Sequence, residues 1–579
     1  MNGADRERVS AEKRRSKAVM NRFTGERSGN VAILFAVLSM PMLMFGGAAI
    51  DYGFATRLET KLQAATDATA LLLCQTPLTT TTADLNAMAQ TTMAGAMGQT
   101  NLVIDPLIIT NNPRQITLSA HKLSTTFFGK LTGTTRINPG AKSQCATPVP
   151  RTFEIALVLD NTGSMSASSG TQSKLQAVQQ AATNFVNYVN TNSSFNSATR
   201  ISIVPFAGAV AVDPTAYRFA NWIDQYGQSS YHWTNVTSLS GTNLNSRFDI
   251  FTKLQRFYSS WGWAGCLETL PYPLNVQDNY PTSSNKDSYY VPLFAPDEPG
   301  DANAGAGYFP TGSRYPTALT YNSYINDDGG INCNNSTNFN TALGQACKYV
   351  TPTNPISANS AGIPNGPNFG CTTQPLLRLT NSTSALKSAI NNMAPLGATN
   401  IHEGLMWGWR TLSPINVFKD DGQAAYATTS DNSDTTTISK IIILMTDGEN
   451  SWTANSNAPT GSLYFASGYF QNANQSSVKT KTPNTRLPPG NQDIKDAVTS
   501  RSALDALTKE ACDNAKKVNI TIFTIGFSVP SDPIDSAGQA LLQKCASSSD
   551  KYFLASTSDD LLKAFDQIQR SIGRLRITQ

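Results

Sequence analysis

One acid and two hydroxyls follow a short apolar run within residues 153–165, FEIALVLDNTGSM. The run Ile155–Leu159 has the length of a strand and ends at Asp160, and Thr162 and Ser164 follow at alternate positions. A buried strand that ends in this way presents one carboxylate and two hydroxyls at the carboxyl edge of a sheet, where open α/β sheets bind ligands. Such hard oxygen donors suit Mg²⁺, Mn²⁺ or Ca²⁺. The alternative is an acidic turn in which Asp160 or Ser164 only caps the next helix.

Two later segments carry oxygen ligands of the same kind. Thr399 lies in a turn after Gly397, and Asp447 follows the apolar run Lys440–Thr446, KIIILMT. A near-continuous apolar run of this length is typical of a strand that is buried on both faces of a sheet. The sequence therefore predicts one site for a divalent cation, with Mg²⁺ first and Mn²⁺ or Ca²⁺ as alternatives. Its predicted ligands are Asp160, Thr162, Ser164, Thr399 and Asp447.

The elements around these residues alternate between helices and strands. After the first strand, the apolar stripe in Lys174–Asn190 predicts a helix, and Arg200–Phe206 predicts a second strand. Strand, helix and strand together form the βαβ unit of a parallel sheet. Later elements of the same kind are expected as helices at 384–393, 504–518, 541–546 and 559–572, and as strands at 440–446, 520–527 and 551–554.

This alternation stops between residues 212 and 380, where the chain is rich in Asn, Pro, Gly and aromatic residues. A structureless segment of this length is unusual inside a compact domain, and its aromatic residues and four cysteines argue against disorder. We expect an inserted subdomain with a small core of its own, and a second, smaller insertion at 455–492. Four cysteines allow three pairings; Cys266–Cys371 with Cys333–Cys347 is preferred, because the latter two are close in sequence.

The N-terminal part has the pattern of a membrane anchor. Residues 1–29 are rich in Arg and Lys, and residues 30–51 contain the uncharged apolar run Val31–Ile50. A helix that rises about 1.5 Å per residue crosses roughly 30 Å of hydrocarbon in twenty residues. The basic flank predicts that the N-terminus stays in the cytoplasm and that the remainder is exported. A cleaved signal peptide is the alternative, since small residues occur at Gly47-Ala48-Ala49.

Residues 52–150 are expected to form a membrane-proximal region. The helical spacing of apolar residues continues over 51–73, and short β-like runs at 102–104 and 107–109 predict a small β-containing part. Scattered cysteines in even number on an exported chain favour disulfides. Cys74 closes the helix and is predicted to pair with Cys145, and Cys512 is predicted to pair with Cys545.

Composition and motifs argue against several classes of function. The net charge is only +4, and no long basic stripe follows the N-terminal tail, so nucleic-acid binding is not expected. His402 begins H-E-x-x-M rather than the zinc motif H-E-x-x-H. Ser164 has no G-x-S-x-G context, and no glycine-rich phosphate loop is present, so we expect no enzyme. Asp297 and Glu298 lack the spacing of a calcium loop and are expected in solvated turns.

The three ligand segments resemble the metal-ion-dependent adhesion site of the von Willebrand factor type A domain. They stand here as Asp160-Asn-Thr162-Gly-Ser164, Gly397-Ala-Thr399-Asn and Met445-Thr-Asp447-Gly-Glu449, in the order of that family. Thr162 replaces the serine of the family and keeps the hydroxyl. The resemblance implies a doubly wound, mostly parallel, Rossmann-like α/β sheet over residues 151–579. It also implies a binding site at which an Asp or Glu of a protein partner completes the shell of the cation.

Both ends of the chain resemble TadG-like proteins of tight-adherence (Flp) pilus assembly in bacteria. The features are the basic tail before a single span with Gly-Gly-Ala-Ala-Ile-Asp51 at its exit, the helix that begins Leu58-Glu-Thr-Lys-Leu, the segment Trp407-Gly-Trp409-Arg-Thr-Leu-Ser413-Pro, and the Cys512/Cys545 pair. The resemblance implies a single-pass inner-membrane protein with a periplasmic or surface-directed bulk, which acts in pilus assembly or envelope adhesion with other pilus-assembly components. The alternative is a surface adhesin that binds host protein or glycan through the metal site and the aromatic insertion.

Overall fold

The structure is a computed structural model that describes residues 30–574 with several gaps. The gaps are 77–79, 111–113, 147–151, 193–194, 196, 238, 300–306, 309–318, 326–338, 354, 358, 361, 428–437, 457 and 472–482. The predicted cytoplasmic tail, residues 1–29, lies outside the described residues. The chain divides into two compact units, Met1–Val149 and Pro150–Thr578, and each is described by itself.

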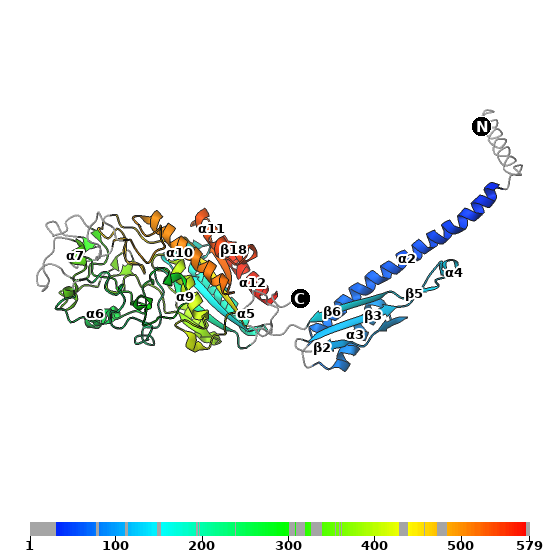
Figure 1. The fold of residues 1–579 in the computed structure, drawn as a ribbon, viewed down its shortest axis with the longest axis horizontal. Coiled ribbons are helices and arrows are strands. Elements are labelled where there is room, and N and C mark those ends of the chain that lie inside the picture. The colour runs from blue at the N-terminus through cyan, green and yellow to red at the C-terminus, as the bar shows by residue number, and fades with distance from the viewer. Residues whose placement is uncertain are drawn as a thin grey trace, which may run out of the picture. The chain divides into compact units, whose positions relative to one another are not determined.

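The first unit is built on a single helix, α2 (Asn30–Cys74), of 45 residues. Figure 1 shows it as one continuous helix, so the predicted span and the helix predicted after it are the same element. Pro41 lies inside the apolar part, where membrane helices tolerate proline. In the described chain, α2 is the one helix that is long and apolar enough to cross a membrane. Most of its side chains between Ile33 and Ile50 are exposed, whereas Leu62, Ala70 and Leu73 are buried.

The buried half of α2 packs on a small antiparallel sheet. Strand β3 (Gln115–Lys122) pairs with β1 (Leu102–Ile104) and β2 (Ile108–Thr110) along one edge and with β6 (Gly140–Ala146) along the other. The predicted β-containing part is therefore confirmed, and the predicted Cys74–Cys145 disulfide ties the end of α2 to β6. Helix α3 (Thr82–Met97), which the threonine-rich sequence did not predict, covers the same core. Strands β4 (Ser124–Thr125) and β5 (Arg136–Ile137) and helix α4 (Gly129–Thr132) form an arm beside α2.

The second unit contains a six-stranded central sheet, which confirms the mixed α/β class. Four neighbouring pairs are parallel, and only the edge strand β15 runs antiparallel to its neighbour. In register, Leu157 lies opposite both Ile203 and Ile443. The strands, in spatial order, are β15 (Leu377–Thr380), β10 (Arg200–Phe206), β7 (Phe153–Asp160), β16 (Ser439–Thr446), β17 (Thr521–Phe527) and β18 (Tyr552–Ala555). Strand β15 falls within the segment that was predicted as an insertion.

Helices cover both faces of this sheet because every second residue of each strand points to the opposite face. Helices α5 (Lys174–Thr191), α8 (Thr383–Asn391) and α12 (Ser558–Arg574) share a core with Leu157 and Ile443. Helices α9 (Ile401–Leu412), α10 (Ala497–Lys517) and α11 (Ser536–Cys545) share another with Val158 and Leu444. The predicted Cys512–Cys545 disulfide is confirmed and joins α10 to α11.

The long insertion packs partly in a small core of its own, as predicted, and partly on the sheet. The small core includes Leu293, Phe339 and Phe369 and is completed by side chains of the second insertion and of the segment just after β10. The rest of the long insertion packs on the sheet. Its Trp222 and Trp261 belong to the same apolar cluster as Val158 of the sheet and Trp407 of α9. The rings of Trp222 and Trp407 are 6.4 Å apart. Since α9 is buried along its whole length, the insertion supplies the cover of its outer face. The described short elements of this part are α6 (Arg247–Leu254), α7 (Phe339–Leu343), β11 (Gly307–Tyr308), β12 (Leu319–Thr320), β13 (Asn359–Ser360) and β14 (Ile363–Pro364), and the β8 (Ser168–Ser169) and β9 (Gln172–Ser173) hairpin precedes α5.

Covalent and ionic links hold the two insertions in place. The predicted Cys266–Cys371 disulfide is confirmed; Cys347 is also disulfide-bonded, but Cys333, its predicted partner, lies outside the described residues. Glu268 of the long insertion accepts hydrogen bonds from Arg247 and from Arg486 of the second insertion. All three side chains are buried, so this ion-paired group joins the insertions in the interior.

Asp297 and Glu298 do not lie in solvated turns, and that expectation is wrong. Both are buried. The Asp297 carboxylate accepts the backbone N–H groups of Tyr324 and Ile325 and lies 3.0 Å from the Lys348 ammonium. Glu298 accepts the backbone N–H of Asn322 at 3.0 Å. Paired carboxylates of this kind organise the loops around them, which spacing alone does not reveal.

Candidate metal centre

Asp160, the last residue of β7, is the buried base of the site. One carboxylate oxygen accepts the backbone N–H of Thr162 at 2.8 Å, and the other accepts the hydroxyl of Thr446 at 2.6 Å. Burial, together with the nearby carboxylate of Asp447, raises the pKa of Asp160 to about 7. The fold therefore holds this carboxyl firmly in an environment that leaves its negative charge incompletely offset.

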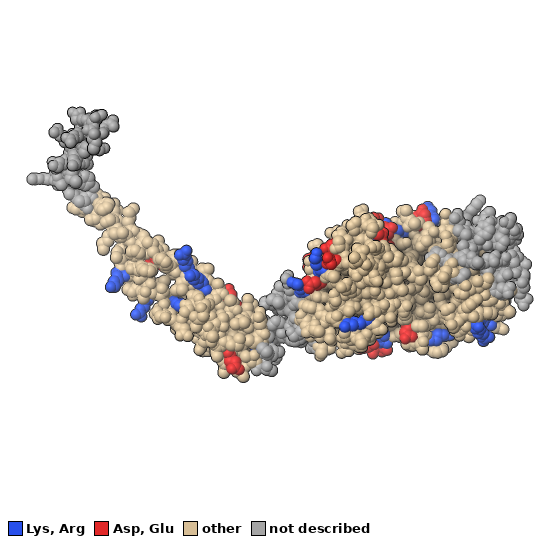
Figure 2. Space-filling view, turned by 180° about the vertical axis from the view of Figure 1, so that it is seen from behind, with Lys and Arg blue, Asp and Glu red and all other residues tan. Residues whose placement is uncertain are grey.

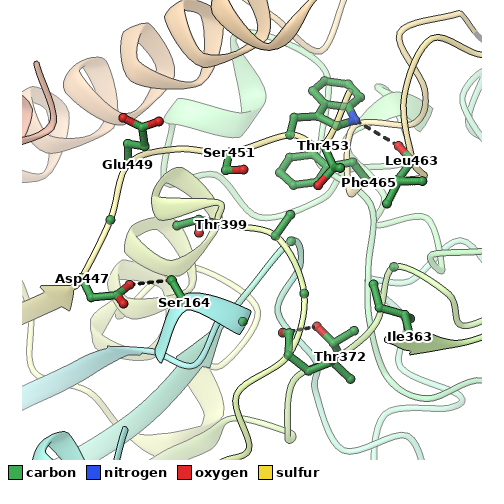
Figure 3. Close-up of a pocket in the computed structure, with 18 of the residues that line it drawn as sticks. Ser164, Ile363, Thr372, Thr399, Asp447, Glu449, Ser451, Thr453, Leu463 and Phe465 are labelled. Carbon is green, nitrogen blue, oxygen red and sulfur yellow. Dashed lines mark hydrogen bonds between the residues drawn. The ribbon is translucent and has the colours of Figure 1, made fainter. Parts of the chain in front are cut away.

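The two hydroxyls of the β7–α5 loop connect to Asp447 at the end of β16. The Thr162 and Ser164 hydroxyl oxygens are 2.9 Å apart, and the Ser164 hydroxyl donates to Asp447 Oδ1 at 2.8 Å. Figure 3 shows Asp447 and Ser164 facing each other across the end of the sheet. Thr162 and Asp447 are buried, whereas Ser164 is exposed. The structure thus brings the oxygens of three predicted ligands together, with Asp160 behind them.

Thr399, the fifth predicted ligand, lies on the loop that leads into α9. Its backbone pairs with that of Ser451 through two hydrogen bonds of 3.1 and 2.9 Å. The preceding Gly397 has φ +95°, and its carbonyl accepts the backbone N–H of Gly163 at 3.0 Å. Glycine suits this position because L side chains rarely adopt such a φ. Thr399 lines the same cleft as Ser164 and Asp447 (Figure 3), so the three predicted segments share one site.

Close helix packing fixes the position of that loop. A Cβ atom added to Gly404 would lie 2.6 Å from the Phe206 ring, and one added to Gly408 would lie 2.4 Å from a methyl of Val158. Both contacts are shorter than a side chain tolerates, so glycine allows α9 to lie directly on β10 and β7. His402, in the first turn of α9, is buried with Nε2 2.8 Å from the carbonyl oxygen of Asn275. Its ring therefore faces the insertion.

Lys174 and Asp532 belong to the site, although the sequence analysis did not identify them. Lys174 is the first residue of α5, and its fully buried ammonium lies 2.8 Å from Asp447 Oδ2 and 2.7 Å from Asp532 Oδ2. Burial raises the pKa of Asp447, and the ammonium of Lys174 opposes this rise. A cation in the first turn of a helix is unfavourable to the helix dipole. That placement was the available signal that Lys174 needed an acidic partner.

The site opens into a cleft of about 560 Å³ with two kinds of wall. The acids Asp447, Glu449, Asp532 and Asp535 line one part, and Arg501 forms ion pairs with Glu449 and Asp535. Apolar side chains line the other part, where the rings of Trp452 and Phe465 stack 4.8 Å apart. Figure 3 shows Leu463, Phe465 and Ile363 on the side of the cleft away from Asp447. The apolar lining residues are Ile363, Phe369, Leu396, Trp452, Leu463 and Phe465.

The donor set fits a hard divalent cation. No group of three or more His, Cys, Asp or Glu side chains in the described ranges could hold a metal ion, so hydroxyls must supply part of any shell. Asp160 and Asp447 are buried carboxylates whose charges interact, and a single ammonium contacts Asp447. Hydroxyl and carboxylate oxygens are the ligands that Mg²⁺, Mn²⁺ and Ca²⁺ prefer. A cation here would offset negative charge of Asp160 and Asp447 that Lys174 compensates only in part.

Several solved structures are similar to parts of the chain. They include the pilus adhesin SpaC of Lactobacillus rhamnosus GG, with 13% identity and a TM-score of 0.30 over 82% of this chain and 35% of that one. The von Willebrand factor domain of the type V pili tip protein Mfa5 of Porphyromonas gingivalis has 12% identity and a TM-score of 0.31, over 74% and 98% of the two chains. The PilB minor pilin of Streptococcus sanguinis has 12% identity and a TM-score of 0.33, over 82% and 78%.

The chain spans about a third of the length of SpaC, the first of these structures. No curated protein matches the chain. Residues 29–72, which comprise nearly all of α2, match a family of known description. That family is Flp pilus-assembly TadE/G-like, and the N-terminal segment of the chain is therefore TadE/G-like.

Proposed function

We propose that this chain is a membrane-anchored, metal-dependent protein-binding module that acts in tight-adherence (Flp) pilus assembly or envelope adhesion. The TadE/G-like segment supports the pilus context and the apolar helix supports the anchor. The observation that carries the binding function is the convergence of Thr162, Ser164 and Asp447. The Ser164 hydroxyl oxygen lies 2.9 Å from that of Thr162 and 2.8 Å from a carboxylate oxygen of Asp447, and Ser164 and Asp447 line the cleft.

The finer description of the second unit is part of the same proposal. Its parallel strand order and its helices on both faces are those expected of a doubly wound von Willebrand factor type A domain. In such a domain the hydroxyls of Thr162, Ser164 and Thr399 would bind the cation, with Asp160 and Asp447 acting directly or through water. Mg²⁺ is the first candidate, and Mn²⁺ or Ca²⁺ would suit the same oxygens.

A bound cation supplies an acceptor for one carboxylate of a protein partner. The rest of the cleft is unfavourable to an acid, because its four lining acids, Asp447, Glu449, Asp532 and Asp535, outnumber the two cations that pair with them, Lys174 and Arg501. An Asp or Glu of a partner is therefore expected to bind only when the cation is present. The apolar wall around Trp452 and Phe465 would receive an uncharged side chain next to that acid.

The site chemistry supports binding rather than catalysis. The Ser164 hydroxyl contacts Thr162 and Asp447, neither of which is a general base of the Ser–His type. The His402 ring faces Asn275. The alternative, an adhesin that stacks host glycans on the insertion, would have to use exposed rings such as Phe219 and Tyr226, because Trp222, Trp261 and Trp263 are buried in the core. The inner-membrane location with a cytoplasmic N-terminus remains part of the proposal and rests on the basic residues before Val31.

Calorimetric titration of the full chain in detergent with Mg²⁺ tests the site. We expect one cation per chain, and we expect Ser164→Ala and Asp447→Asn to abolish binding. Ser168→Ala is the matched control, because it removes a hydroxyl of the same loop that donates to the Gly170 carbonyl and to none of the predicted ligands in the described structure. A second arm captures co-expressed pilus-assembly proteins in Mg²⁺ and in EDTA. Equal capture in both buffers, or no heat with Mg²⁺, Mn²⁺ and Ca²⁺, would refute the proposed function.

A further inference from the structure

The arm Ser124–Ile137 of the first unit is attached to the apolar part of α2. Its short helix α4 packs against α2. Gly47 is the one buried residue of α2 between Ile33 and Ile50, and a Cβ atom added there would lie 2.8 Å from Phe128. Figure 1 shows α4 and β5 beside α2, farther toward its N-terminal end than β3 and β6. The arm therefore reaches the segment of α2 that is suited to hydrocarbon.

Hydrogen bonds hold the arm at this level of the helix. The buried carboxylate of Asp51 accepts the backbone N–H of Phe127 at 2.8 Å and that of Phe128 at 3.0 Å. The Phe127 ring lies 5.2 Å from the ring of Phe54. Asp51 directly follows the last apolar residue, Ile50. With a rise of about 1.5 Å per residue, the contact at Gly47 lies roughly 4–5 Å inside the end of the apolar segment.

The arm and the adjoining part of α2 expose several large apolar side chains. Phe127 is 75% exposed, Leu131 45% and Phe128 39%, and Phe54 of α2 is 49% exposed beside them. Soluble surfaces rarely gather large apolar side chains in this way, and such patches mark membrane or protein contacts. This patch continues directly into the exposed apolar surface of α2 between Ile33 and Ile50.

Basic side chains lie next to this apolar patch. Arg57 and Lys61 line a groove of about 510 Å³ between α2 and the arm, together with hydroxyls of Thr125 and Thr126. Figure 2 shows Lys and Arg side chains along this narrow part of the first unit. Arg57 and Lys61 lie seven and eleven residues beyond Ile50 on α2, which places their backbones roughly 10 and 16 Å outside the apolar segment. Their long side chains can extend back toward the headgroups. Lys and Arg at this depth attract anionic headgroups.

We propose that the arm is a second membrane contact of this chain, which lies in the interface of the bilayer. Phe127, Phe128 and Leu131 enter the boundary between acyl chains and headgroups, and Arg57 and Lys61 bind the phosphates of anionic phospholipids. This inference rests on the proposed anchoring by α2 and extends it. A lone helix is free to rotate and slide in the membrane, whereas a helix with this arm is fixed in depth and rotation.

Spin labels on single added cysteines test the arm in the full chain, reconstituted in vesicles of phosphatidylglycerol and phosphatidylcholine. The labelled variants are Phe127→Cys and Leu131→Cys, with Phe45→Cys as the lipid control and Ile108→Cys as the aqueous control. Ile108 is 61% exposed on β2 of the same unit. The measurement is the accessibility of each label to oxygen relative to a water-soluble nickel complex. We expect this ratio to be severalfold higher at 127 and 131 than at 108.

The two controls separate the possible failures. A lipid-like label at 45 with aqueous labels at 127 and 131 would overturn the arm contact while leaving the anchor intact. Aqueous labels at all four positions would overturn the anchor and the arm together. The charge is tested by Arg57→Gln with Lys61→Gln, which should lower the ratio at 127 in phosphatidylglycerol vesicles but not in pure phosphatidylcholine. No difference between the two lipids in the unmodified chain would overturn the assignment of anionic headgroups.

Discussion

Replacement of Lys174 by methionine removes the one cation that the described structure places against Asp447. Methionine keeps an unbranched apolar stem, so the change deletes charge with little loss of packing. In the parent chain the ammonium lies 2.8 Å from Asp447 Oδ2 and both side chains are fully buried. After the substitution, Asp447 keeps only the Ser164 hydroxyl among the hydrogen-bond partners found for its carboxylate. The variant thus leaves an ionised group buried without its counter-charge.

The expected cost follows from burial. Removal of one partner from a buried ion pair destabilises a protein by about 3–5 kcal/mol. The second partner, Asp532, has a side chain that is 46% exposed. Loss of its ion pair should cost only the ~0–1 kcal/mol of a surface pair, because water can replace the ammonium. We therefore expect Lys174→Met to lower the free energy of unfolding by about 3–5 kcal/mol in chelator.

Mg²⁺ should recover much of this loss, because a divalent cation at the proposed site compensates the same carboxylate. Without the repulsion of the ammonium, the variant should bind the cation more tightly. Each tenfold gain in affinity recovers about 1.4 kcal/mol at a fixed cation concentration well above the dissociation constant. The deficit of the variant is therefore expected to shrink in Mg²⁺.

Urea denaturation of the full chain in detergent, with EDTA or with Mg²⁺, measures both quantities. Lys509→Met is the matched control, since Lys509 forms an exposed pair with Asp513 and its loss should change stability by at most about 1 kcal/mol. An equal deficit in EDTA and in Mg²⁺ would show that the ammonium and the cation do not act on the same carboxylate. Unchanged stability in EDTA would show that Asp447 does not depend on Lys174.

Three further predictions concern the packing of α9, a buried histidine and a disulfide of the second unit. Gly408→Ala should lower stability by about 1–3 kcal/mol in urea denaturation, because the added Cβ meets Val158 at 2.4 Å; an unchanged midpoint would contradict the close packing of α9. Burial lowers the pKa of His232, so below pH 6.5 the unfolded chain takes up a proton that the folded chain resists. The free energy of unfolding should then decrease as the pH is lowered below 6.5, by at most about 1.4 kcal/mol per pH unit. His232→Gln should lack this contribution to the pH dependence. Joint replacement of Cys266 and Cys371 by serine should cost about 2–5 kcal/mol, measured without reductant against the parent chain.

The strands of the site were predictable because their local pattern is unambiguous. Phe153–Asp160 and Ser439–Thr446 are apolar over nearly their whole length, and each ends next to an acid. Parallel strands bring their carboxyl ends to one edge, so the proximity of Asp160 and Asp447 followed from the fold class alone. The segments that contain Asp160 and Asp447 could be found because both lie at strand ends. Thr399 lies on the loop before α9 and was identified from its turn after Gly397.

Other parts depended on partners far away in the sequence. Lys174 acquires its role from Asp532, 358 residues later, and helical periodicity gives no indication of such a pair. Trp222 packs on Trp407 without any regular spacing between insertion and helix. Asp297 resembled a solvated turn until the backbone N–H groups of Tyr324 and Ile325 were seen to surround it. These are tertiary contacts, which one-dimensional patterns do not contain.

The polar residues of the site and the apolar wall of its cleft come from different parts of the fold. The acids and hydroxyls come from the ends of β7 and β16, where backbone pairing on both sides leaves little freedom. The two insertions leave the same edge of the sheet, one after β10 and one after β16, and they supply Ile363, Leu463 and Phe465 of the cleft wall. Insertions at this edge can vary without disturbing the register of the strands, because loops tolerate changes that buried strands do not. The ends of the strands therefore position the oxygen atoms of the proposed cation site, and the insertions shape the wall of the cleft beside it.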